Sequence, residues 1–90
     1  MKKNLRQAMR DLGYCLHEGI GVKKDYEAAA RWYRKAAKAG DAKAQYTLGL
    51  CYLDGEGLRQ SRRCAAYWFR KATHQGHKMA KKNLSAIAEI

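Results

Sequence analysis

Hydrophobic residues recur along this chain with the spacing of amphipathic helices. Over residues 41–54 the apolar positions follow the pattern i, i+4, i+7 and i+8, which places them on one face of an α-helix. These positions are Ala44, Leu48, Cys51 and Tyr52. A second apolar stripe, over residues 61–75, comprises Cys64, Ala65, Trp68 and Ala72. The two stripes predict two amphipathic helices joined by a short loop.

Polar residues and glycines mark the ends of these helices. Gly55 can adopt the left-handed conformation that commonly ends a helix. Ser61 can accept a hydrogen bond from the free N–H groups of the turn that follows it, and Asp25 and Asp41 stand in equivalent places. Because the chain contains no proline, no residue within the stripes removes a backbone donor. Long uninterrupted helices are therefore expected.

The same pattern occurs twice, at an offset of 36 residues. The matched pairs include Gly13/Gly49, Cys15/Cys51, Gly19/Gly55, Ala29/Ala65, Trp32/Trp68 and Ala36/Ala72. A fixed period of this length is the signature of a helical repeat protein. We therefore divide a single domain, 1–90, into repeat one (about 5–40), repeat two (about 41–76) and a capping helix (77–90).

Gly13 and Gly49 fall inside predicted helices, where glycine costs about 1 kcal/mol relative to alanine. We expect close approach of a neighbouring helix at both positions to offset that cost. In the capping helix, Ala80, Leu84 and Ile87 would face repeat two. The prediction is an all-α, right-handed α/α superhelix of five antiparallel helices. So short a stack is expected to have modest stability or to self-associate.

The motif resembles the Sel-one-like repeats, which are relatives of the tetratricopeptide repeats. Repeat two carries it as Ala44, Leu48-Gly49, Tyr52, Gly55, Gly57, Ala65, Trp68-Phe69, Lys71-Ala72 and Gly76. Repeat one departs from it at Leu16, where the family has tyrosine. The resemblance implies a non-catalytic scaffold or adaptor for protein–protein interaction, of a kind common in bacteria, and it does not name a partner.

The resemblance also implies where a partner binds, because the first helix of each tetratricopeptide-like repeat lines the concave surface. The first-helix residues off the buried stripe are Gln7, Arg10, Tyr14, His17, Lys43, Tyr46, Leu50, Leu53, Met79 and Lys82. Their mixture of aromatic, aliphatic and cationic groups suits an acidic and apolar peptide. The alternative is that these are ordinary surface positions, and that Leu50 and Leu53 simply pack against neighbouring helices.

Charge suggests a second surface. The chain has 19 Lys and Arg against 8 Asp and Glu, a formal charge of +11, which favours acidic partners of any kind. A basic stripe along the second helices comprises Arg31, Arg34, Lys35, Lys38, Arg62, Arg63, Arg70 and Lys71. Such a stripe could contact nucleic acid or another anionic surface. A solvated face is the favoured interpretation, because no groove-reading motif accompanies the charge.

Residues for catalysis or cofactor binding are not grouped in any known motif. His74, His77 and Cys64 lack the spacing of a metal site, and no cofactor is expected. Three cysteines form no disulfide framework. No apolar stretch is long enough to span a membrane, and no apolar segment follows the basic start as in a signal peptide. We therefore expect a cytoplasmic protein that is not an enzyme.

Overall fold

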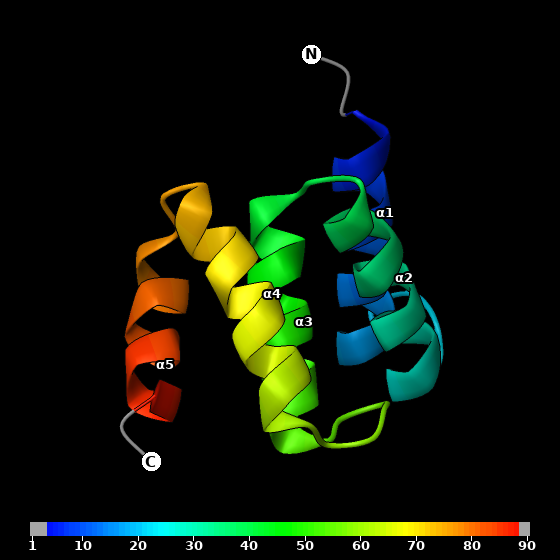
Figure 1. Cartoon of the computed structure of the whole chain (residues 1–90). Coiled ribbons are helices and arrows are strands. Elements are labelled where there is room, and N and C mark those ends of the chain that lie inside the picture. Colours follow the sequence, from blue (N-terminus) through cyan, green and yellow to red (C-terminus); the bar gives the residue numbers. More distant parts are fainter. Residues whose placement is uncertain (1–3, 89–90) are drawn as a thin grey trace.

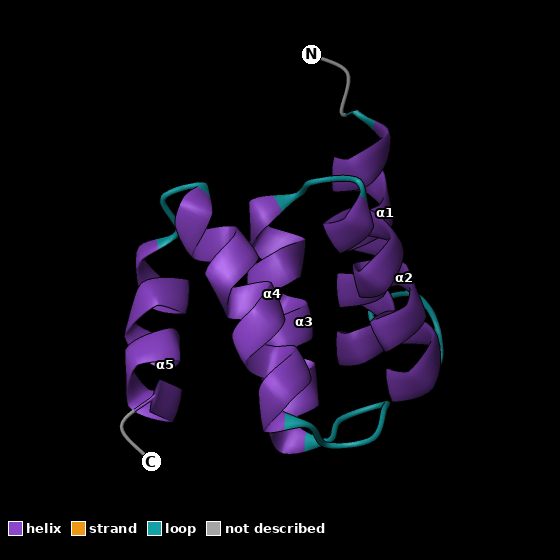
Figure 2. Cartoon of the chain, in the orientation of Figure 1, coloured by secondary structure: helices purple, strands orange, loops and turns teal. Residues whose placement is uncertain are grey.

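The structure is a computed structural model that describes residues 4–88. It contains five helices and, within that range, no strand (Figures 1 and 2). They are α1 (Leu5–Glu18), α2 (Tyr26–Lys38), α3 (Ala42–Asp54), α4 (Arg62–His74) and α5 (Lys78–Ala88). The all-α class and the five helices are confirmed. The capping helix was expected to reach residue 90, and residues 89–90 lie outside the described range.

Consecutive helices pack against each other in a continuous stack. α2 contacts both α1 and α3, and α4 contacts both α3 and α5. In Figure 1, α2 and α4 lie in front of α1 and α3, so the first and second helices of the repeats form two layers. We call α1, α3 and α5 the A helices, and α2 and α4 the B helices. The arrangement is the expected α/α solenoid.

The predicted capping residues all begin helices. The side chains of Asp25, Asp41 and Ser61 each accept a hydrogen bond from the backbone N–H three residues later, at 2.8 to 3.1 Å. Gly19 and Gly55 end α1 and α3 with φ values of 72° and 69°. These are left-handed conformations in which a side chain is strained. Local sequence signals therefore set the ends of the helices.

The glycines inside α1 and α3 make room for aromatic rings of the B helices. A Cβ atom on Gly49 would lie 2.6 Å from the Phe69 ring, and one on Gly13 would lie 3.0 Å from the Tyr33 ring. Both distances are shorter than a carbon–carbon contact at optimal separation. The expected close approach is thus confirmed, and the group that approaches is a ring on the paired helix.

The core lies where α2, α3 and α4 meet. Leu48 and Phe69 are fully buried at its centre. Leu12, at the position of repeat one that matches Leu48, is 38% exposed. Trp32 and Trp68 occupy matching positions of the two repeats, yet Trp32 is half-buried whereas Trp68 is buried. Within the described residues, α1 packs mainly on α2, whereas α3 packs on both α2 and α4, so more helices surround Leu48 than Leu12.

Candidate functional site

The A-helix positions predicted to bind a partner fall into two groups in the structure. Tyr14, Lys43, Met79 and Lys82 are exposed, and they are contributed by all three A helices. Tyr14 and Met79 expose about half of their surface, 54% and 51%. We call these four residues the A-helix surface. The other six predicted positions are engaged in contacts within the chain.

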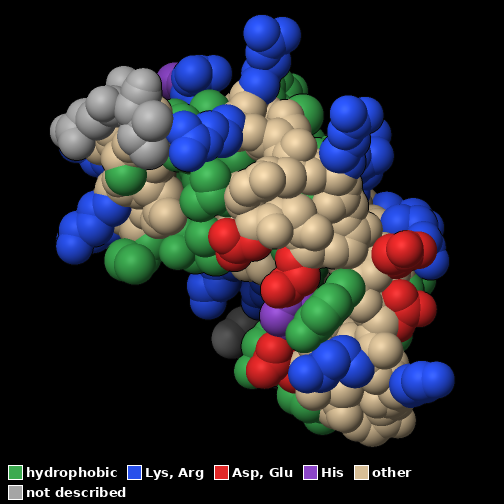
Figure 3. Space-filling model, turned by 90° about the horizontal axis from the view of Figure 1, so that it is seen from below, with side chains coloured by type: hydrophobic (Ala, Val, Ile, Leu, Met, Phe, Trp, Pro, Cys, Tyr) green, Lys and Arg blue, Asp and Glu red, His purple; other side chains and the backbone are tan. Residues whose placement is uncertain are grey.

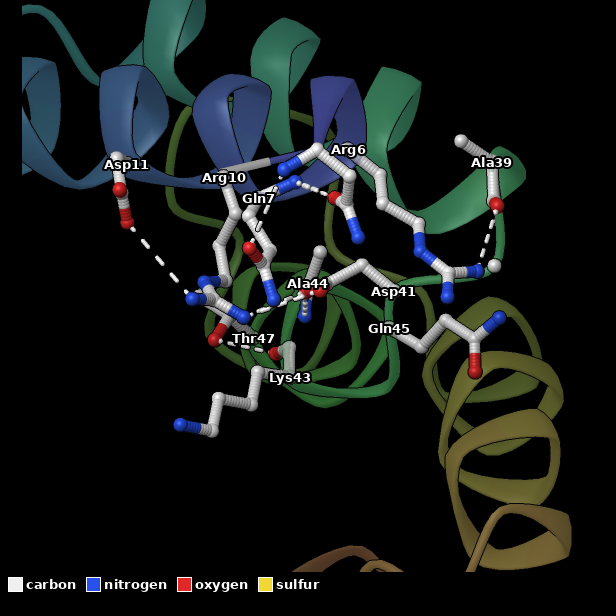
Figure 4. A network of polar contacts seen from close by, with 12 residues as sticks. Arg6, Gln7, Arg10, Asp11, Ala39, Asp41, Lys43, Ala44, Gln45 and Thr47 are labelled. Carbon is white, nitrogen blue, oxygen red and sulfur yellow. Dashed lines mark hydrogen bonds and ion pairs between the residues drawn. The ribbon is translucent and has the colours of Figure 1, made fainter. Parts of the chain in front are cut away.

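Arg10 and Gln7 stabilise α1 and its junction with repeat two. Arg10 donates hydrogen bonds to both carboxylate oxygens of Asp41, at 3.0 and 3.2 Å, and lies 3.8 Å from Asp11 (Figure 4). Asp41 is buried and also caps α3. Gln7 accepts a hydrogen bond from the backbone of Asn4 in a capping box at the start of α1. Both side chains therefore hold the scaffold together.

His17 forms a second junction between the repeats. Its Nε2 atom is hydrogen-bonded to Glu56, which lies in the loop after α3, and its Nδ1 atom lies 2.7 Å from Glu18. The ring packs against Tyr26 at 4.9 Å. Burial by itself would lower the pKa of His17, but the hydrogen bonds and charges of the two glutamates outweigh it, so the pKa is raised. The pair with Glu56 links repeat one to repeat two.

Tyr46, Leu50 and Leu53 are half-buried and pack against the core. Tyr46 stacks on His77, with ring centroids 4.5 Å apart, and lies 5.8 Å from the Phe69 ring. The Nδ1 atom of His77 accepts a hydrogen bond from the backbone at the start of α5. Leu50 and Leu53 therefore contribute to the packing around the core.

The eight cations of the basic stripe are all exposed. Within residues 4–88, none of them forms an ion pair with a carboxylate. Lys35 covers the ring of Trp32, with its Nζ atom 4.5 Å from the centroid, and Lys71 covers Tyr67 at 5.3 Å. Two of the aromatic faces that a nucleic-acid base could stack on are therefore already covered by cations.

A cleft between α2 and α4, with a volume of about 520 Å³, was missed by the sequence interpretation. Its cationic residues are Arg34, Lys38 and Lys71, and the side chains of Gln45 and Tyr52 reach it from α3. The three cations were each assigned to the basic stripe. Nothing in the repeat register showed that they converge, because Lys38 and Lys71 do not occupy matching positions of the two repeats.

Acidic side chains gather elsewhere on the molecule. Figure 3 shows carboxylates clustered around a histidine on the face seen from below, with Lys and Arg side chains around them. Glu18 and Glu56, the partners of His17, lie at the ends of α1 and α3 where the chain turns into the B helices. Within the described residues, no carboxylate lines the cleft between α2 and α4.

The three cysteines are free thiols, at Cys15, Cys51 and Cys64. Cys51 is buried, and burial raises the pKa of its thiol to about 11. This thiol is therefore protonated at neutral pH and packs as a small apolar group. Over residues 4–88, no cluster of three or more His, Cys, Asp and Glu side chains is arranged to hold a metal ion.

The repeat register, the caps and the glycine–ring contacts together describe one repeating unit. A family model described as the Sel1 repeat matches residues 6–41 and 42–77. The chain belongs to the Sel1 repeat family. Sel1 repeat proteins are generally scaffolds for protein–protein interaction. No curated protein sequence matches the chain.

Solved structures share this Sel1 fold. A Sel1 repeat protein from Oxalobacter formigenes is 40% identical, with a TM-score of 0.90 over 92% of the chain. A protective antigen of uropathogenic Escherichia coli with an SLR fold is 35% identical, with a TM-score of 0.90 over 92%. The cysteine-rich protein B of Helicobacter pylori is 32% identical, with a TM-score of 0.85 over 88%.

The chain spans only part of these relatives. It covers 34%, 18% and 59% of the three solved chains, respectively. The match therefore establishes the repeat unit and its stacking. Within residues 4–88, no helix combines the length and the apolar character needed to cross a bilayer.

Proposed function

We propose that this chain is a non-catalytic scaffold that binds a protein or peptide partner on the A-helix surface. The observation that carries the proposal is the exposure of Tyr14 and Met79 on separate A helices of a Sel1 repeat stack. Exposed aromatic and methionine side chains are enriched where proteins bind one another. We also propose that the chain acts in the cytoplasm and that residues 1–90 form one binding domain.

The charges of the same surface support an acidic partner. Lys43 and Lys82 are the exposed cations among the four residues of the A-helix surface. Arg10 does not add to this charge, because Asp41 neutralises it. A partner segment that combines one or two carboxylates with an apolar side chain would complement both features.

The test is affinity capture from lysate followed by mass spectrometry, performed at two salt concentrations so that charge-driven background is removed. Tyr14→Ser combined with Met79→Ser should abolish the enrichment of the salt-resistant partner. Both side chains are exposed, so circular dichroism should show unchanged helicity. Tyr46 and Leu50 are less suitable targets because they also pack against the core.

A matched control removes two exposed apolar side chains outside this surface. Ile20→Ser with Val22→Ser alters the loop between α1 and α2, where both residues are exposed. This variant should capture the partner as the parent chain does. Equal capture by both double variants would show that the A-helix surface does not bind the partner.

A further inference from the structure

The cleft between α2 and α4 brings together three cations whose charge no carboxylate neutralises. Arg34 and Lys38 line it from α2 and Lys71 lines it from α4. Among residues 4–88, none of the three forms an ion pair, and no acidic residue lines the cleft. Like charges that converge on a protein cleft raise the local concentration of anions.

The floor of the cleft is held in place by hydrogen bonds. Gln45, only 5% exposed, donates to the backbone oxygen of Ala37 at 3.1 Å and accepts from Gln75 at 3.0 Å. Arg34 donates to the hydroxyl of the buried Tyr52 and lies 6.0 Å from its ring centroid. These contacts fix the floor of the cleft and the direction of the guanidinium before any ligand binds.

We propose that this cleft binds an acidic peptide segment of a partner protein through side-chain carboxylates. The planar guanidinium of Arg34 suits bidentate binding of one carboxylate, and Lys38 and Lys71 can each pair with others. Lys38 and Lys71 are exposed, so the cleft opens to solvent and can admit a chain segment. This site lies on the B helices and is separate from the A-helix surface.

Two other occupants are less compatible with the geometry. A single-stranded nucleic acid gains much of its affinity from base stacking on free aromatic rings, whereas Lys71 covers the Tyr67 ring at 5.3 Å. A second copy of the chain would bring together two molecules that each carry a formal charge of +11. Their mutual repulsion opposes that contact.

The test is isothermal titration calorimetry with an acetylated hexaglutamate peptide in about 0.15 M NaCl, where weak surface attraction is largely screened. Lys38→Gln with Lys71→Gln should weaken binding by roughly tenfold or more, because two charge-assisted contacts are lost. The matched control is Lys35→Gln with Arg70→Gln. It removes two charges from the same helices at exposed positions outside the cleft, and it should weaken binding by less than about threefold.

Three further measurements decide the outcome. Acetylated hexaglutamine should not bind, and binding as tight as that of hexaglutamate would overturn the role of carboxylates. If the cleft variant and the control variant weaken binding equally, the peptide is attracted by the overall positive charge, and the proposal of a specific site in the cleft is wrong. A single-stranded oligonucleotide that displaces the peptide and loses affinity equally in both variants would assign the surface to nucleic acid instead.

Tyr14→Ser with Met79→Ser should leave peptide binding unchanged, so this proposal is tested independently of the A-helix surface.

Discussion

At the scale of a single residue, Gly49 explains why the repeat has a glycine inside α3, although glycine weakens an isolated helix. The Phe69 ring occupies the space that a Cβ atom would need, at 2.6 Å. Phe69 is fully buried, so the surrounding core restricts its movement. Close packing of a large ring therefore offsets the helix propensity that glycine gives up.

Gly49→Ala should lower the free energy of unfolding by up to about 2 kcal/mol, measured by urea denaturation followed by circular dichroism. Alanine regains about 1 kcal/mol of helix propensity, but overpacking of a core costs about 1–3 kcal/mol. Gly13→Ala is the matched control, because its Cβ would meet the Tyr33 ring at a longer distance, 3.0 Å. A smaller loss is expected there, and a larger loss for Gly13→Ala would contradict the explanation.

At the scale of elements, polar contacts complement the helix packing between the two repeats. The backbone of α3 packs mainly on α2 and α4. Arg10 connects α1 to the cap of α3, and His17 connects α1 to Glu56 after α3. Arg10 lies near the middle of α1 and His17 lies in its last turn, so the two contacts together restrict the orientation of α1 relative to repeat two.

The His17 junction should make stability depend on pH. Because the pKa of His17 is raised in the folded chain, its stabilising effect is fully present below the unfolded value of about 6.5 and is lost as the pH rises through the folded value. Thermal unfolding at about pH 6 and pH 8.5 should show a decrease in Tm that is larger for the parent chain than for His17→Gln. The effect is modest because His17 is partly exposed to solvent.

Glu56→Gln serves as the control for this junction, since it removes the charge that pairs with His17 Nε2. Its Tm should change with pH less than that of the parent chain, because Glu18 alone remains to raise the pKa of His17. If both variants keep the full pH dependence of the parent chain, the titrating group lies elsewhere.

At the scale of the whole molecule, an excess of positive charge surrounds a small core. The formal charge is +11 over 90 residues. Salt screens charges on the surface over about 10 Å at 0.1 M. Repulsion between the cations of the folded chain therefore opposes compaction at low ionic strength.

Raising NaCl from about 0.02 to 0.5 M should increase the Tm, by about 4–8 °C for each ~1 kcal/mol of repulsion that is screened. Differential scanning fluorimetry would measure this shift. Arg62→Gln with Arg63→Gln removes two exposed cations from the first turn of α4, where positive charge also opposes the helix dipole. This variant should be more stable at low salt and show a smaller shift. A Tm that falls with salt would mean that attractive ion pairs dominate.

The local structure of this protein follows from its sequence. Apolar spacing identified the helices, and Asp41, Ser61 and Gly55 marked their ends within one or two residues, because caps and stripes depend only on neighbours along the chain. The repeat register also predicted the close contacts at both helical glycines. These features are repeated, so each copy supports the interpretation of the other.

Tertiary structure decided what each matched position does. Leu12 and Leu48 share a register, yet only Leu48 is buried, because burial depends on how many helices surround it. Arg10 was expected to face a partner, but it is paired with Asp41 across the junction between the repeats. The cleft beside Arg34 forms where residues of α2, α3 and α4 come together. Sequence alone thus determined the repeat unit. The stacking of the helices determined which side chains remain free to bind, because exposure and charge pairing depend on contacts between segments far apart in the chain.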